Sequence, residues 1–227
     1  KNVWHWFIFG GSVLAPFLLG VLFTSIVRGM PIDENMTMWA TFTDYVNVYS
    51  VVGGLAVVLL TLVHGLTFIG LRTTGPVHTR ALALLNKVYI ALFGGLVVFA
   101  VLTYFNTDLF TVRPVATPVF LVCIVLAALL GFIFANKGKE GWAFTMSGLT
   151  IVLTVAMLFV GLFPRVMISS IDPAFNLTID NAASGQYTLS LMTKISLTLL
   201  PFVLGYQIWS YYIFRKRISH KDTVNYE

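Results

Sequence analysis

Two ionisable side chains lie within long apolar runs of this sequence, and they are the residues there most able to do chemistry. His64 lies in LVHGL (62–66), and Lys194 lies near the start of the last apolar run. An ionisable residue at membrane depth is energetically costly and therefore points to a function. His64 could ligate a haem iron or relay protons, and Lys194 could carry protons or contact a quinone. The alternatives, which we favour, are a neutral imidazole bonded to a neighbouring helix and an ammonium group that extends to the outer headgroups.

The number of histidines argues against haem in this chain. A haem bound by two histidines inside a bilayer needs both of them at membrane depth, and His64 has no such companion. The other three are expected near the cytoplasmic surface or in the C-terminal tail: His5, His78 and His220. Methionine can replace one axial histidine, but Met146 and Met157 are expected to fill gaps in packing. We therefore predict no catalytic residue and no metal ligand, with His64 as the single cofactor-binding candidate.

The composition places the chain in a lipid bilayer. Of its 227 residues, 58% are hydrophobic and only 10% are charged, whereas a soluble domain has about a quarter of its residues charged. The net charge of +5 does not indicate nucleic-acid binding, because the basic residues form no single patch. The one cysteine, Cys123, excludes an internal disulfide and is expected to pack as a small apolar side chain.

Six long uncharged runs separate the charged residues, and each is long enough to span a membrane. A helix needs about 20 apolar residues to cross the hydrocarbon core. The runs show no strand-like alternation, which excludes a barrel. The sequence therefore predicts an all-α integral membrane protein with a single transmembrane domain over 1–227. The predicted helices cover 6–27, 45–71, 88–107, 115–136, 142–163 and 191–214.

Small residues within these runs should let the helices approach closely, since lipid offers no hydrophobic drive for their association. Three glycine pairs, together with one alanine and one glycine four residues apart, mark the expected contacts. These are Gly10–Gly11, Gly53–Gly54, Gly94–Gly95, and Ala127 with Gly131.

The basic residues predict how the chain is oriented. One set of loops contains ten of them: Lys1, Arg72, Arg80, Lys87, Lys137, Lys139, Arg215, Lys216, Arg217 and Lys221. The opposite loops contain only Arg28, Arg113 and Arg165. Loops rich in Lys and Arg stay in the cytoplasm, so both ends of this sequence are predicted to be cytoplasmic.

A long polar connection, 165–190, joins the last two helices on the outer face. Within it, 175–180 alternates apolar and polar residues, as an extended strand on an apolar surface does. Residues 181–185 predict a turn, and Thr188 or Ser190 could cap the last helix. We interpret the connection as a cap over the outer end of the helix bundle.

Several stretches resemble subunit II of the cytochrome bd quinol oxidases, most closely members from Bacillus. They include VWHWFIFGGSVLAPFLLGVLFTSIVRGMPID (3–33), DYVNVYSVVGGL (44–55), HGLTFIGLRTTG (64–75), LFPRVMISS (162–170), NLTIDNAASGQYTL (176–189) and LLPFVLGYQIWSYYIFRKRISHK (199–221). The resemblance runs along the whole chain in order. Family members have roughly a hundred further residues before this point, enough for about three more helices and roughly nine in all. The sequence is therefore expected to lack its first hundred or so residues.

The resemblance implies one subunit of a heterodimeric terminal oxidase in the bacterial plasma membrane. The complex would oxidise quinol and reduce dioxygen to water. In that family subunit I binds two b-type haems, haem d and the quinol, whereas subunit II resembles it in fold and binds no haem. The resemblance leaves open ubiquinol or menaquinol as donor, a small single-helix third subunit, and bound lipid or quinone.

Three functions follow as expectations. The first is a haem-free structural subunit that supports the haem-binding subunit through helix packing. The second is part of a membrane transporter bundle. Transporters usually have broken helices and charges near the midplane, and this sequence has no acidic residue there. The third is an inert remnant, because a bundle without its first helices would expose polar and small-residue faces to lipid.

Overall fold

The computed structural model describes residues 2–214, and long helices dominate it. The long helices are α1 (Asn2–Arg28), α3 (Val48–Arg72), α4 (Pro76–Asn106), α6 (Ala116–Asn136), α7 (Glu140–Leu162) and α8 (Gln186–Ile213). All six are long and apolar enough to cross a membrane. The predicted all-α integral membrane fold with six spanning helices is confirmed. Some residues used above lie outside the described part of the chain: Lys1, Arg215, Lys216, Arg217, His220 and Lys221.

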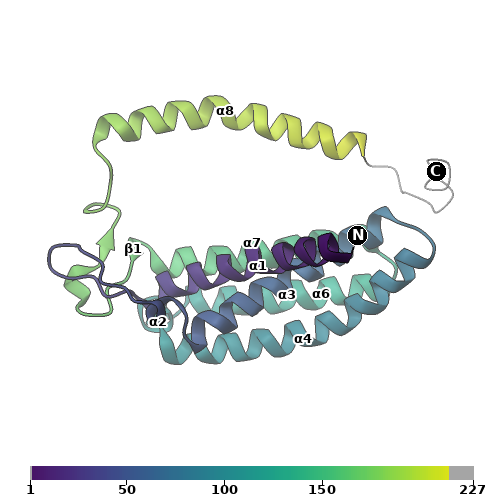
Figure 1. Ribbon diagram of the computed structural model, residues 1–227, viewed down its shortest axis with the longest axis horizontal. Coiled ribbons are helices and arrows are strands. Elements are labelled where there is room, and N and C mark those ends of the chain that lie inside the picture. Colours follow the sequence, from purple (N-terminus) through teal and green to yellow (C-terminus); the bar gives the residue numbers. More distant parts are fainter. Residues whose placement is uncertain (1, 215–227) are drawn as a thin grey trace.

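Five of the helices form one bundle, and α8 stands apart from it. Helix α3 packs against α1, α4 and α7, and α6 packs against α7. Figure 1 shows α8 running beside this bundle at a distance. In its most apolar 18-residue window, 0% of the residues are buried, compared with 39% in α3. Near its C-terminal end, however, the Tyr211 ring meets Phe68 of α3 edge-to-face at 6.4 Å.

Glycines bring α1 and α3 into backbone contact. A Cβ placed on Gly20 would lie 2.7 Å from the Gly53 carbonyl oxygen and 2.7 Å from the Gly54 Cα. Gly53 also faces Thr24 of α1. The predicted close helix contact at Gly53–Gly54 is therefore confirmed. A Cβ on Gly10 or Gly11 would meet nothing within 4 Å, so these glycines mark no contact within the described chain.

Aromatic residues fill the core between α3, α4 and α6. The Tyr49 ring stacks on Phe99 with centroids 5.6 Å apart, and its hydroxyl lies 3.2 Å from the Thr103 hydroxyl. Tyr89 is fully buried and meets Phe132 edge-to-face at 5.4 Å. These contacts join residues that are far apart in sequence into one core.

Four helices, α1, α4, α7 and α8, start earlier than predicted, and the difference is largest at α4. Helix α4 begins at Pro76 rather than at 88, because charge marks the edge of the hydrocarbon layer and not the end of a helix. A glycine with φ 75 at Gly75 and a proline in the first turn start it there. Helix α8 begins at Gln186 with Gly185 at its N-cap. Thr188 and Ser190 lie inside α8, so their predicted capping role is wrong.

The outer-face connection contains a short antiparallel pair of strands. Strand β1 (Arg165–Met167) pairs with β2 (Leu177–Thr178), and a 3₁₀ turn, η1 (Pro173–Phe175), precedes β2. The extended segment was predicted over 175–180, so the strand is shorter and begins after the 3₁₀ turn. The Asn181 side chain accepts a hydrogen bond from the Thr178 N–H at 2.7 Å, which closes the turn that follows.

Candidate functional site

His64 lies at the contact between α3 and α7, where its ring is already engaged. Its Nδ1 is 2.9 Å from the Ser147 hydroxyl oxygen, and its ring stacks on Phe144 with centroids 4.4 Å apart. The Thr67 hydroxyl donates to the His64 carbonyl at 2.8 Å and lies 3.1 Å from the Ser147 hydroxyl. The imidazole therefore belongs to a small polar cluster that joins two helices.

Neither of the two methionines considered as a second axial ligand lies beside His64. Met146 has its Cβ 3.4 Å from the position of a Cβ on Gly131, so it faces α6, whereas its neighbour Ser147 faces α3. Met157 is ten residues after Ser147 on α7, about 15 Å further along the helix axis. Within residues 2–214, neither methionine can supply a second axial ligand to an iron on His64. His64 lines none of the cavities described below.

The other histidines of the described chain lie at helix ends. His5 is exposed near the start of α1. His78, in the first turn of α4, bonds through Nε2 to the Glu140 carboxylate at the start of α7. This contact links two neighbouring turns of the bundle, and sequence reasoning missed it because the partners are 62 residues apart.

Lys194 is exposed on α8, eight residues after the helix begins. The Thr198 hydroxyl donates to its backbone carbonyl at 2.8 Å. Lys194 lies about 12 Å along the axis from the helix start, and extension of its ammonium group to the outer headgroups stays a prediction.

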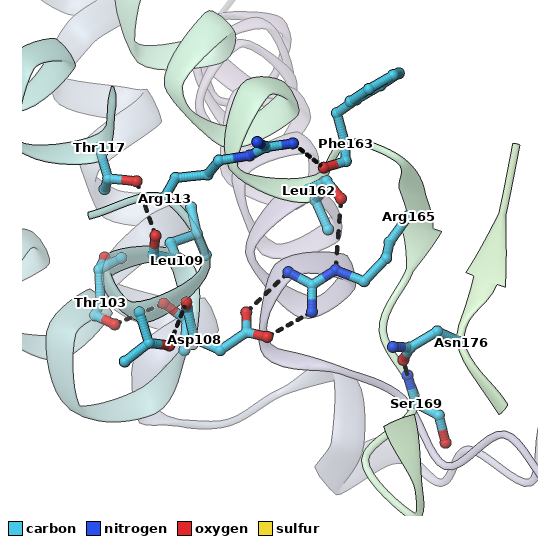
Figure 2. A network of polar contacts seen from close by, with 12 residues as sticks. Thr103, Asp108, Leu109, Arg113, Thr117, Leu162, Phe163, Arg165, Ser169 and Asn176 are labelled. Carbon is cyan, nitrogen blue, oxygen red and sulfur yellow. Dashed lines mark hydrogen bonds and ion pairs between the residues drawn. The ribbon is translucent and has the colours of Figure 1, made fainter. Parts of the chain in front are cut away.

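A network of polar contacts holds the outer end of the bundle together, as Figure 2 shows. Both Asp108 carboxylate oxygens bond to the Arg165 guanidinium, at 2.5 and 3.0 Å. Arg113 donates to the Phe163 carbonyl at 2.7 Å, and the Thr117 hydroxyl donates to the Leu109 carbonyl. The network joins the short helix α5 (Leu109–Val112) to the strand β1 and the end of α7. It contains two of the three arginines predicted on the outer side.

The loop between α1 and α3 is also fixed by hydrogen bonds. Asp33 accepts three of them: from the Asn35 and Thr37 amides, both at 2.9 Å, and from the Trp39 indole at 2.8 Å. The Trp39 indole and then the Thr37 amide lower the pKa of the Asp33 carboxyl. The loop is tied to the outer-face connection, because the Ser169 hydroxyl donates to the Ile32 carbonyl at 2.8 Å.

Two cavities differ in character. One, of about 140 Å³, is apolar and lies between α1, α3, α4 and α7 at the level of Gly20 and Gly53. The other, of about 520 Å³, is open and more polar, and lies at the outer end beside Arg28, Asp108 and Ser169. Among the described residues, no group of three or more His, Cys, Asp or Glu side chains could hold a metal ion.

Comparison with known proteins identifies relatives along the whole chain. The family model described as cytochrome bd terminal oxidase subunit II matches residues 1–214. The cytochrome bd ubiquinol oxidase subunit 2 of Bacillus subtilis is 50% identical over 225 residues, which are 99% of this chain and 67% of the relative.

More distant relatives have similar names. The cytochrome bd-I ubiquinol oxidase subunit 2 of Escherichia coli is 29% identical and covers 98% of this chain, which spans 67% of that relative. A probable cytochrome oxidase subunit 2 of Haemophilus influenzae is 26% identical over 93% of this chain and 64% of its own length. The chain thus spans about two thirds of the length of these relatives.

Proposed function

Because the chain belongs to the cytochrome bd terminal oxidase subunit II family, we propose that it is a haem-free structural subunit of a terminal oxidase. The complex oxidises quinol and reduces dioxygen to water. The observation that supports the haem-free role is the setting of His64: within residues 2–214 neither Met146 nor Met157 is placed to complete an axial pair with it, and Phe144 stacks on its ring. His64 remains the one cofactor-binding candidate, and its role in this proposal is to join α3 to α7.

The catalytic centres belong to the partner, subunit I, with which the chain forms a heterodimer. Two b-type haems, haem d and the quinol would bind there. The exposed length of α8 and the open start of α1, with Gly10 and Gly11, supply apolar surface for packing against other membrane helices. The chain thus contributes shape and support, while electrons pass through groups that its partner binds.

The chain is oriented with both ends of 1–227 on the cytoplasmic side of a bacterial plasma membrane. Figure 1 has the N-terminus and the α3–α4 turn at one end of the bundle, and β1 at the other. The end with the α3–α4 turn contains Arg72 and Arg80, and the α6–α7 turn adds Lys137 and Lys139. This arrangement agrees with cytoplasmic retention of basic loops.

A transporter is the less favoured alternative. Among the described membrane-spanning helices, an acidic residue occurs only at Glu140, the first residue of α7. A substrate or ion site near the midplane of a transporter usually contains a charge or a broken helix. The described helices place no acidic group there.

The test is a pull-down of the full-length subunit from bacterial membranes, followed by a reduced-minus-oxidised spectrum. We expect a co-purifying haem protein with a haem d band. His64→Ala should leave all haem bands unchanged. Ser147→Ala, which removes only the hydroxyl that bonds to His64, should also leave them unchanged. Loss of one b-type band in His64→Ala alone would contradict the haem-free role, and the absence of any haem-binding partner would contradict the oxidase function.

A further inference from the structure

The loop between α1 and α3 presents large apolar side chains to its surroundings. We call Met38, Trp39 and Phe42 the aromatic tip. Trp39 is 68% exposed and Phe42 is 77% exposed. Exposed aromatic side chains are typical anchors of protein interfaces, because they bury a large area at a small cost in side-chain entropy.

The aromatic tip is held rigidly although it is exposed. The Trp39 indole donates to Asp33 at 2.8 Å, and its backbone amide donates to the Pro31 carbonyl at 2.9 Å. Phe42 begins the short helix α2 (Phe42–Tyr45), where Asp44 accepts hydrogen bonds from both the N–H and the hydroxyl of Thr41 at 2.7 Å. An anchor that is fixed before binding loses less entropy when a partner arrives.

Lipid is a poor occupant for this surface. Figure 1 shows the loop projecting beyond the outer end of the helix bundle, past the end of α1. Acidic side chains lie on the same loop as the apolar ones: Asp33 and Glu34 precede them, and Asp44 follows. Carboxylates placed beside a hydrocarbon surface would have to be desolvated without a partner.

The outer face as a whole is acidic. Six acidic residues lie on its loops: Asp33, Glu34, Asp44, Asp108, Asp172 and Asp180. Of its three arginines, Arg165 is paired with Asp108 and Arg113 donates to the Phe163 carbonyl, which leaves Arg28 on the exposed surface. The charge complement of this face is therefore a basic surface.

We propose that the aromatic tip docks onto the outer surface of the partner subunit, on a segment that combines Lys or Arg residues with an apolar recess. This inference rests on the proposed function, because it requires the oxidase partner. Trp39 and Phe42 fill the recess, and Glu34 faces the basic residues around it. The contact supplements helix packing within the bilayer with a second contact in water.

The experiment places a photo-reactive benzoylphenylalanine at Trp39 of the full-length subunit in the assembled complex. The matched control is the same replacement at Trp142, which is 60% exposed but lies at the start of α7, at the opposite end of the bundle. We expect position 39, and not 142, to form an adduct with a Lys- or Arg-containing outer segment of the partner. Adducts with lipid alone, with a second copy of this chain, or with no protein would overturn the docking proposal.

Charge variants at Glu34 test whether the partner presents a basic surface to this loop. Glu34→Lys in the crosslinking chain should lower the adduct yield at least about fivefold, because like charges then face each other, whereas Glu34→Asp should keep it. Salt at about 1 M should also lower the yield with Glu34 present, since it screens exposed charges. An equal yield for all three side chains would overturn the basic complement. If the complex contains haem but position 39 forms no adduct with the partner, only the docking proposal is contradicted. If no haem-binding partner co-purifies, the proposed function is contradicted as well.

Discussion

The imidazole of His64 shows how a partner distant in the sequence fixes the surroundings of a side chain. The sequence indicated an ionisable group at membrane depth, but it could not distinguish an iron ligand from a bonded neutral side chain. The hydrogen-bond partner of His64, Ser147, is 83 residues away in the sequence, and its hydroxyl approaches only because α3 packs on α7. Serine is common in such helices, so no local pattern marks it as a partner.

Asp33 gives a prediction about pH at the residue scale. Hydrogen bonds from Trp39 and Thr37 lower the pKa of its carboxyl, so the bonded loop is favoured at every pH above the pKa of an unfolded Asp, about 3.9. That contribution is lost as the pH falls through the lower folded value. The protection of the Asn35 and Thr37 amides against hydrogen exchange, relative to an unfolded peptide at the same pH, should therefore persist at neutral pH and be lost only in acid.

The control for this pH effect is Asp33→Ala. Without the carboxylate, the Asn35 and Thr37 amides should show little protection at any pH, and the Trp39 fluorescence should show no acid transition. An acid transition that persists in Asp33→Ala would assign it to another group, with Asp44 the first candidate because its pKa is also lowered, mainly by the Thr41 amide.

At the scale of elements, the contact between α1 and α3 depends on Gly20. We expect Gly20→Ala to lower the free energy of unfolding by about 1–3 kcal/mol, as overpacking does. The added methyl group would meet the backbone of Gly53 and Gly54, which cannot move aside as a flexible side chain can. Denaturation of the purified subunit in detergent or bicelles measures the loss.

Helix α1 supplies a matched control. A Cβ on Gly10 meets nothing within 4 Å, so Gly10→Ala should cost nothing and could gain helix propensity. Similar losses for both variants would show that the close approach at Gly20 does not limit stability.

The outer network gives a second prediction at this scale. Asp108→Asn removes the charge that pairs with Arg165, whose side chain is only 12% exposed. Breaking a buried pair costs about 3–5 kcal/mol, but the Asp108 side chain is 39% exposed, which reduces the expected loss to about 1–2 kcal/mol. Thermal unfolding of the subunit should show the shift. Asp180→Asn, on the same face and exposed, should leave stability unchanged within about 0.5 kcal/mol.

The helices were predictable from sequence, and their ends were not. Each membrane-spanning helix is identified by its long apolar run, because a helix needs about 20 apolar residues to cross the hydrocarbon core. The first turns of α4 contain Arg80 and Lys87, and both residue types are good helix formers. The charged residues therefore did not mark where α4 begins. The strand β2 was shorter than the alternation indicated, because Pro173 starts a 3₁₀ turn. The Asp108–Arg165 ion pair could not be predicted from the sequence, because its two residues are 57 positions apart.

At the scale of the whole molecule, α8 is the least supported element. A connection at 182–185 that is exposed and not helical precedes it. We expect proteinase K to cut the isolated 227-residue chain in this connection, and to cut it much more slowly in the assembled oxidase, because α8 is then packed against neighbouring helices. Mass spectrometry of the fragments identifies the site. Equal cleavage rates in the two samples would mean that assembly leaves α8 unsupported.

The crossing of α1 and α3 at Gly20 has a mechanical meaning. With their backbones touching, the two helices are coupled at this crossing, and the loop 29–47 joins their ends on one side of the bundle. We therefore expect a displacement of that loop to be shared by α1 and α3.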